Sequence, residues 1–370
     1  MRVVCTGSSG SDRMGYLQGV KQLAHEAGIP LEVCSVGDMM LDKAQHIGSP
    51  VSREKILDLP SSSLEWLRGT VFEEIVRKAA SHENTIIATH TCFRWKKFLS
   101  PAFDTYYLSQ LDPDFYVTIT DDYDAIRRRL DQIQQWRGRL QLWEILVWRD
   151  EEALITKILA QNFRKPHYLI ARQEPPEILF DLMFRPERKR AYLSYPITAI
   201  EKEQPEHLDK VMEFLAELRQ HLTVFNPLAM TELERAKRLQ EEADVEMSAE
   251  LVRMLEDQTV ARDYQFIDQS DFVIVYYPVK EPSPGVLSEL IYGFSHDKEV
   301  YMVFPYDISP FLQFYCTEIF NTGEELIDHL RKEKIIGTDE LGYHPSPSKM
   351  GDAGEEGCRN EADHQHSPQR

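Results

Sequence analysis

Glu289 is the residue whose neighbours in the sequence best suit chemistry. Gly285 stands four positions before it and Gly293 four positions after it, so on a helix the three residues share one face. A carboxylate between two glycines leaves room for a ligand to lie against it. We therefore predict that Glu289 is a functional carboxylate rather than an ordinary charge on a helix surface.

A second group of candidate residues lies near the N-terminus. An apolar strand over residues 2–6 runs into the turn G-S-S-G-S-D-R-M at 7–14, and an amphipathic helix follows. This order of elements is the context of a phosphate-binding loop. The full motif G-x-x-x-x-G-K-[ST] is absent, because Asp12, Arg13 and Met14 replace its glycine, lysine and magnesium-binding hydroxyl.

The elements around Glu289 can be predicted from their residue types. Residues 272–277 are a short apolar run rich in β-branched and aromatic residues, which is typical of a strand buried in a parallel sheet. Ser283 suits a helix N-cap, and Pro284 suits the first helical position because it lacks an N–H. The helix is expected to turn five apolar residues toward a core: Val286, Leu287, Leu290, Ile291 and Phe294.

Composition bounds the class of protein. With 370 residues the chain is too long for one ordinary core, and 42% hydrophobic with 28% charged residues is typical of a soluble globular protein. The formal net charge of −19 argues against binding to nucleic acid or to an anionic membrane. A small phosphate-bearing ligand remains compatible with this charge.

Targeting and redox signals indicate a cytoplasmic protein. No apolar run approaches the roughly 20 residues that cross a bilayer, and the N-terminus lacks the hydrophobic region of a signal peptide. The five cysteines are scattered without C-x-x-C spacing, so we expect reduced thiols and no metal site.

Strands alternate with helices along most of the chain. This alternation predicts an α/β protein with two doubly wound parallel sheets. We place the first domain at residues 1–187 and the second at 188–336, because residues 185–190 are charged and contain proline. Residues 337–370 lack apolar periodicity and are predicted to be a disordered tail.

The first domain resembles the adenylate kinase family, most nearly the archaeal type, over about residues 1–184. The resemblance rests on the glycine turn and on three further stretches: I-I-A-T-H at 86–90, L-D-P-D-F-Y-V-T-I-T at 111–120 and the arginine-bearing pattern at 124–139. It implies a P-loop kinase-like domain that has lost the loop lysine and the hydroxyl after it. That loss favours a fold kept for assembly or nucleotide sensing over an active kinase.

This resemblance also implies which residues bind phosphate in the first domain. The loop, with Gly7, Gly10 and Arg13, would cradle the phosphates of ATP, and Arg128 and Arg137 would neutralise the transferred phosphoryl group. ATP and magnesium are the ligands that it allows there, although Met14 cannot hold magnesium.

The second domain, about residues 190–335, resembles the nucleoside 2-deoxyribosyltransferase superfamily. Its nearest relatives look like the 2'-deoxynucleoside 5'-phosphate N-hydrolases and the related CMP N-glycosidases. Three stretches carry the resemblance: Y-L-S-Y-P-I-T at 192–198, R-D-Y-x-x-I-x-x-S-D at 262–271 and S-P-G-V-x-x-E-L at 283–290. The resemblance implies a Rossmann-like domain with a nucleotide site.

The same resemblance assigns roles to residues. Glu289 matches the catalytic glutamate, and Asp263 matches the carboxylate that works with it. Tyr192 matches an active-site tyrosine, and the turn at Ile197 and Thr198 matches a loop that contacts sugar and phosphate. Ser283, with Gly285 in the helix start, stands where free-nucleoside transferases carry a carboxylate. Because a carboxylate would repel a 5'-phosphate, serine favours a nucleotide substrate.

The predicted reaction is hydrolysis of a nucleoside or deoxynucleoside 5'-monophosphate to free base and (deoxy)ribose 5-phosphate. It needs no metal or cofactor, since a carboxylate can stabilise the oxocarbenium-like centre at C1'. The alternatives are a nucleoside monophosphate kinase, a bifunctional enzyme, and a non-catalytic nucleotide sensor or scaffold. Base transfer between nucleosides is a weaker alternative. We expect the protein to form homo-oligomers, as members of both families do.

Overall fold

The structure of this chain is a computed structural model. It describes residues 1–46, 51–96, 98–203, 206–231, 233 and 249–337. Residues 1–336 form one compact unit. The tail predicted at 337–370 lies, apart from Gly337, outside the described residues.

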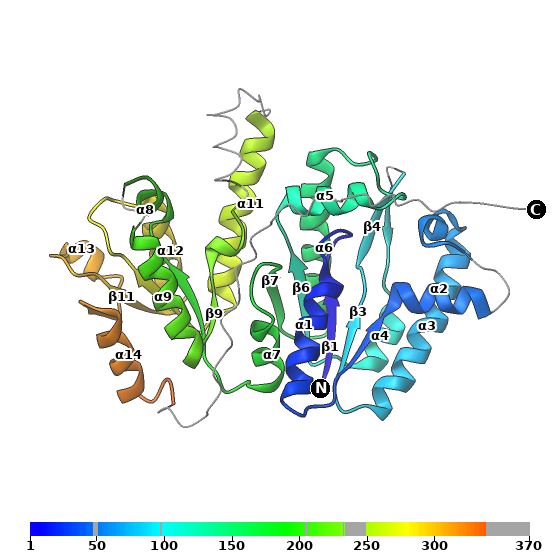
Figure 1. Ribbon diagram of the computed structural model, residues 1–370, viewed down its shortest axis with the longest axis horizontal. Helices are drawn as coiled ribbons and strands as arrows, with labels where there is room; N and C mark the ends of the chain where they lie inside the picture. Colours follow the sequence, from blue (N-terminus) through cyan, green and yellow to red (C-terminus); the bar gives the residue numbers. More distant parts are fainter. Residues whose placement is uncertain (47–50, 97, 204–205, 232, 234–248, 338–370) are drawn as a thin grey trace, which may run out of the picture. The chain divides into compact units, whose positions relative to one another are not determined.

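The first sheet is parallel and has the strand order β2-β3-β1-β6-β7. Its strands are β1 (Arg2–Thr6), β2 (Glu32–Ser35), β3 (Thr85–Ala88), β6 (Phe115–Thr120) and β7 (His167–Ala171). Helices cover both faces (Figure 1), namely α1 (Arg13–Glu26), α2 (Val36–His46), α3 (Ser61–Ser81), α4 (Thr105–Leu111), α6 (Leu142–Asn162) and α7 (Glu177–Phe184). Because side chains alternate along a strand, Val3 packs with α1 while Val4 packs with α3.

A small antiparallel pair, β4 (Cys92–Trp95) and β5 (Phe98–Pro101), was not predicted from the sequence. Lys96 begins its turn with a φ of 50°, a backbone conformation that more often belongs to Gly or Asn. The turn therefore has no recognisable residue signature. The remaining elements of this half are the 3-10 helix η1 (Arg53–Asp58) and α5 (Tyr123–Gln132).

The second sheet is also parallel, with the order β12-β11-β10-β8-β9. Its strands are β8 (Arg190–Ser194), β9 (Thr223–Phe225), β10 (Phe272–Tyr276), β11 (Glu299–Val303) and β12 (Glu318–Phe320). Around it lie α8 (Ile197–Glu203), α9 (Glu206–His221), η2 (Pro227–Ala229), α11 (Ala249–Asp268), α12 (Pro284–Ser295), α13 (Pro310–Gln313) and α14 (Gly323–Lys332). In chain order this is the doubly wound arrangement 2-1-3-4-5, whose direction reverses between β8 and β10.

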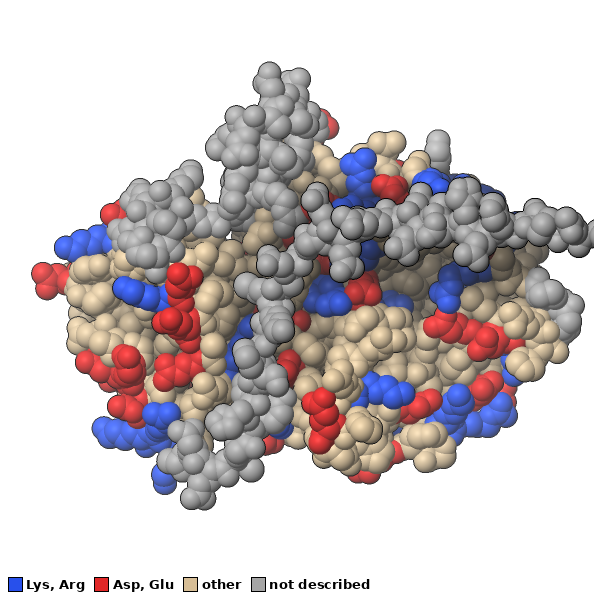
Figure 2. Space-filling view, in the orientation of Figure 1, with Lys and Arg blue, Asp and Glu red and all other residues tan. Residues whose placement is uncertain are grey.

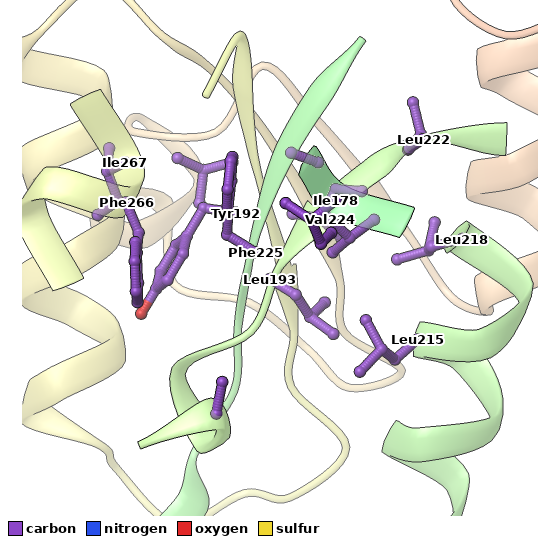
Figure 3. Packing of buried hydrophobic residues seen from close by; sticks show 14 of the residues in the cluster. Ile178, Tyr192, Leu193, Leu215, Leu218, Leu222, Val224, Phe225, Phe266 and Ile267 are labelled. Carbon is purple, nitrogen blue, oxygen red and sulfur yellow. The ribbon is translucent and has the colours of Figure 1, made fainter. Parts of the chain in front are cut away.

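The core of the second sheet has two sides, which Figure 3 shows in close-up. Tyr192 and Phe225 pack with Phe266 of α11, with ring centroids 6.4 Å and 5.9 Å from it. Val224 lies on the opposite side, with Leu218 of α9. This packing holds α11, the helix that contains Asp263, against β8 and β9.

The predicted fold class, α/β with two doubly wound parallel sheets, is confirmed. The domain boundary proposed at 187/188 falls between α7 and β8 and stays a prediction. Two local expectations are wrong. Residues 197 and 198 begin helix α8 instead of forming a turn. Ile291 and Phe294 are 40% and 41% exposed rather than in the core, since the face of that helix buried against the sheet is formed by Val286, Leu290 and Gly293.

Charged residues mark the surface around the second sheet. Figure 2 shows acidic side chains gathered over α9 and α14. Glu213 of α9 and Glu324 and Asp328 of α14 are exposed. Within the described residues, no helix combines the length and the apolar character needed to cross a membrane.

Candidate functional site

Glu289 lies at the point where the second sheet reverses its strand order. Ser194 is the last residue of β8, and α12, which carries Glu289, follows the carboxyl end of the neighbouring strand β10. Helix α11 contributes Asp263 next to the same strands. Ligands of open α/β sheets bind at this kind of position, so the topology gathers the predicted catalytic residues where a ligand site belongs.

The carboxylates are held by short polar contacts. The Ser194 hydroxyl donates a hydrogen bond to Glu289 Oε2 over 2.5 Å. Arg262 Nε donates to Asp263 Oδ1 over 3.1 Å. Ser194, Tyr192, Arg262 and Asp263 are buried, whereas Glu289 is half-buried. Sequence analysis quoted the stretches containing Ser194 and Arg262 but gave neither a role, because only the fold shows that they bond the two carboxylates.

The protonation of Glu289 is shifted by its surroundings. Burial, and then the nearby negative charge of Asp263, raise the pKa of Glu289 from 4.5 to about 8, against the lowering effect of Ser194, Tyr192 and Arg262. Two carboxylates that influence each other in this way share protons as a pair. Such perturbed acids mark candidate catalytic sites.

The Tyr192 hydroxyl is buried and interacts with Glu289 by hydrogen bonding, which lowers the pKa of Glu289 against the raising effect of burial. Burial, followed by the charges of Asp263 and Glu289, keeps the pKa of Tyr192 well above its ordinary value. A neutral, buried O–H thus lies beside the two carboxylates.

The predicted phosphate-contacting residues lie at the start of α12. Ser283 is its N-cap and accepts a hydrogen bond from Val286 N over 3.5 Å, and Pro284 follows as predicted. A Cβ added to Gly285 would meet nothing within 4 Å, so this turn is open. Gly293 has a different role, because a Cβ there would lie 2.9 Å from Val273 Cγ2. Gly293 therefore allows close helix–sheet packing and leaves no room for a ligand.

Ile197 and Thr198 follow Ser194 closely in the chain. Ile197 is half-buried, and its N–H donates to Tyr195 O over 2.9 Å, while Thr198 is exposed. Across the described residues, no hydrogen bond or ion pair joins either residue to Glu289. Their predicted contact with the substrate stays a prediction.

The glycine turn of the first sheet is tightly packed. Arg13 Nη1 donates to Gly7 O over 2.7 Å. A Cβ on Gly7 would lie 2.6 Å from Ile119 O, and one on Gly10 would lie 2.9 Å from Ile126 O, where Gly10 also has a φ of 86°. Both positions thus require glycine, and Arg13, the first residue of α1, reaches back to the turn with its side chain.

The other two predicted arginines lie on the surface. Arg128 is close to Asp124, at 3.9 Å, and Arg137 Nε donates to Asp131 O. Their neighbour Arg129 instead reaches the turn, donating to Gly10 O over 2.8 Å and to buried Asp121 over 2.6 Å. The pattern R-R-R at 127–129 contained this residue, but only the helix phase of α5 selects it.

A buried carboxylate lies beyond the carboxyl ends of β1 and β3. Glu152 of α6 accepts hydrogen bonds from the backbone N–H groups of Gly7 (3.2 Å), Thr91 (2.8 Å) and Cys92 (3.1 Å). Burial raises the pKa of Glu152, against the lowering effect of these N–H groups and of Arg13. Glu152 was not predicted, because a glutamate in the middle of a helix has no local sequence signature.

Metal binding finds little support in the first sheet. No cluster of three His, Cys, Asp or Glu side chains suited to a metal ion occurs in the part of the chain that the structure describes. Met14 offers only a thioether sulfur, a poor ligand for magnesium, and Asp121 is ion-paired with Arg129. These residues fit ATP-bound magnesium poorly.

Two cavities lie away from Glu289. One is lined by Asp150, Arg253, Gln258 and their neighbours, and the other by residues such as Asp271, Glu318 and His329. Neither cavity contains the pair of Glu289 and Asp263, and the candidate site is defined by the hydrogen bonds to these two carboxylates.

Comparison with known proteins bears on the first half of the chain. Residues 18–142 match the family model described as the AAA domain, from within α1 to the first residue of α6. The match begins after the glycine turn. It covers about a third of the chain and shows a similarity of this segment to the AAA domain.

Two solved structures are similar to this chain at a low level. Shikimate kinase from Bacteroides thetaiotaomicron has 14% identity and a TM-score of 0.32, over 50% of this chain and 97% of that chain. An uncharacterized protein from Eubacterium ventriosum ATCC 27560 has 16% identity and a TM-score of 0.26, over 50% of this chain and 96% of that chain. Similarities this low carry no weight for function.

Proposed function

We propose that the second sheet carries a nucleotide N-glycosidase site. The observation that carries this proposal is the cluster at the β8–β10 reversal: Glu289 bonded by Ser194, Asp263 bonded by Arg262, and the buried hydroxyl of Tyr192 beside both carboxylates. Glycosidases cleave the glycosidic bond with a pair of carboxyl groups, one of which has a raised pKa.

The reaction breaks the bond between sugar C1' and the ring nitrogen of the base. Glu289 and Asp263 share a proton as a pair, and when that proton lies on Asp263 the ionised Glu289 captures or shields the positive charge that develops at C1'. Asp263 delivers a proton to the departing base and takes one from water, whose hydroxyl ends on C1'. The products are the free base and a sugar 5-phosphate, and no metal or cofactor enters this scheme.

The start of α12 supports a 5'-monophosphate substrate. This helix has 12 residues, so its N-terminal N–H groups and dipole favour an anion. Ser283 adds a hydroxyl without charge, and Gly285 leaves the first turn open. We extend the proposal to self-association into a homo-oligomer, which only the resemblance to oligomeric families supports.

A second candidate function is nucleotide binding or phosphoryl transfer at the first sheet. The AAA-domain match favours it, as do Arg13 and Arg129, which both contact the glycine turn. Met14 and the buried Glu152 weigh against catalysis there. Binding without product would leave this half as a nucleotide sensor or scaffold.

Product analysis separates the two candidates. Purified protein is incubated with a panel of ribo- and deoxyribonucleoside monophosphates, with and without ATP and magnesium, and products are identified by mass spectrometry. Free base plus sugar 5-phosphate, formed without ATP, supports the N-glycosidase. Nucleoside diphosphate formed only with ATP moves the activity to the first sheet, and the absence of any product refutes both reactions.

A further inference from the structure

Asp12 occupies an unusual place in the glycine turn. It is the N-cap of α1 and has a left-handed backbone with a φ of 54°, a conformation that normally favours glycine. Its carboxylate oxygen Oδ2 accepts hydrogen bonds from Arg172 Nε over 3.0 Å and from Arg172 Nη2 over 2.7 Å. This ion pair was not foreseen, since Arg172 lies 160 positions along the chain.

The fold makes room for the Asp12 carboxylate on the first turn of α1. A Cβ added to Gly15 would lie 2.6 Å from both carboxylate oxygens. Arg172 is fixed as well, because its N–H donates to Thr120 O over 2.6 Å and its guanidinium lies 5.9 Å from the centre of the Tyr16 ring. The carboxylate is therefore held by the residues around it.

A ligand phosphate at this turn would need the same place. The N-terminus of a helix favours a negative charge, and an arginine beside it binds phosphate well. Here the carboxylate of Asp12 already pairs with Arg172 and lies over the first turn beside Gly15, although it accepts no hydrogen bond from the N–H groups of the helix. A phosphate must displace Asp12 to reach them, and until then it meets a like charge.

We propose that Asp12 is an internal anion that competes with a ligand phosphate for the first turn of α1 and for Arg172. Asp12 thereby sets the affinity of the first sheet for phosphate-bearing nucleotides, and Arg172 is the cation that a phosphate gains. This inference rests on the second candidate function above and is independent of the N-glycosidase.

The test is calorimetric titration of the full chain with ATP and with adenosine. Asp12→Asn removes the charge and keeps a residue that tolerates the left-handed backbone. We expect it to bind ATP about tenfold more tightly or better, with adenosine binding unchanged. The gain should disappear in Asp12→Asn combined with Arg172→Gln. Asp12→Gly is the second variant, because glycine suits the backbone even if asparagine destabilises the turn.

Asp112→Asn is the matched control. Asp112 also has a left-handed backbone, with a φ of 44°, and an ion pair of 2.8 Å with Lys165, but it lies at the end of α4. It should leave ATP binding unchanged. Equal or weaker ATP binding by both Asp12 variants would overturn the competition while leaving nucleotide binding intact. If neither the unmodified chain nor the variants bind ATP, both the competition and the second candidate function fail.

Discussion

At the scale of single residues, the proposed site centres on the pair of Glu289 and Asp263. Burial and the negative charge of Asp263 raise the pKa of Glu289 to about 8, so the pair keeps a shared proton at pH values where an ordinary glutamate is ionised. Ser194, Tyr192 and Arg262 lessen this effect without removing it. The site thus keeps one proton available and one carboxylate ionised, as general acid–base chemistry needs.

The shifted pKa of Glu289 predicts a pH dependence of stability. Because the pKa of the folded state lies above the usual 4.5, the folded protein binds more protons than the unfolded chain between about pH 4.5 and 8. The contribution of Glu289 to stability is complete below this window and is lost as the pH rises through it. We expect the denaturant midpoint of the unmodified chain to fall across the window more steeply than that of Glu289→Gln.

Other buried acids contribute to the same pH dependence. Burial raises the pKa of Glu152, Glu174 and Asp181 as well, so only the difference between the two proteins reports on Glu289. Parallel midpoint curves would contradict the shifted pKa and weaken the case for a proton-sharing pair.

At the scale of elements, α12 has one glycine that packs against the sheet and another in the first turn, where we propose that the substrate binds. Gly293 packs against β10, while Gly285 faces open space in the first turn. Gly293→Ala should lower the free energy of unfolding by about 1–3 kcal/mol, because its Cβ would collide with Val273. Gly285→Ala should change stability by less than about 1 kcal/mol but raise KM for the nucleotide.

Chemical denaturation and steady-state kinetics on the two glycine variants check this contrast. Each variant serves as the control for the other, since both add one methyl group to the same helix. If Gly285→Ala left KM unchanged, the start of α12 would have no part in substrate binding.

The sequence predicted these elements better than their contacts. Strand β1 and the cap at Ser283 were predicted correctly, because apolar runs and capping residues have local signatures. Ile291 and Phe294 were wrongly assigned to the core, since spacing gives a helix stripe but not how much of it a neighbour covers. Arg129 was missed because three successive arginines differ only in helix phase.

At the scale of the whole molecule, α11 and Gln269, the residue that follows it, contact elements of the first half. The side chain of Gln269 pairs with the backbone of Leu169 in β7, accepting from its N–H and donating to its C=O, both over 2.8 Å. Gln258 donates to Leu146 O, and Lys157 donates to Gln265. The first half therefore supports the helix that carries Asp263, a dependence between distant residues that no local pattern predicts.

Gln269→Leu tests this support. It would leave the buried N–H and C=O of Leu169 without their partners, and we expect a loss of about 2 kcal/mol or more in the free energy of unfolding. Gln265→Leu is the matched control, because it removes one contact of a half-buried side chain, which should cost under about 1 kcal/mol. Urea denaturation measures both, and equal losses would show that Gln269 has no special role.

The central claim is that Glu289 and its neighbours cleave the N-glycosidic bond of a nucleotide. The most direct measurement is the rate of free-base release from the best monophosphate substrate by the unmodified chain, by Glu289→Gln and by Glu299→Gln. Glu299 is exposed at the start of β11, away from the carboxyl ends of the strands. We predict that Glu289→Gln lowers the rate by about a thousandfold or more, whereas Glu299→Gln retains it. Release that survives Glu289→Gln undiminished, in protein that folds normally, would contradict the claim.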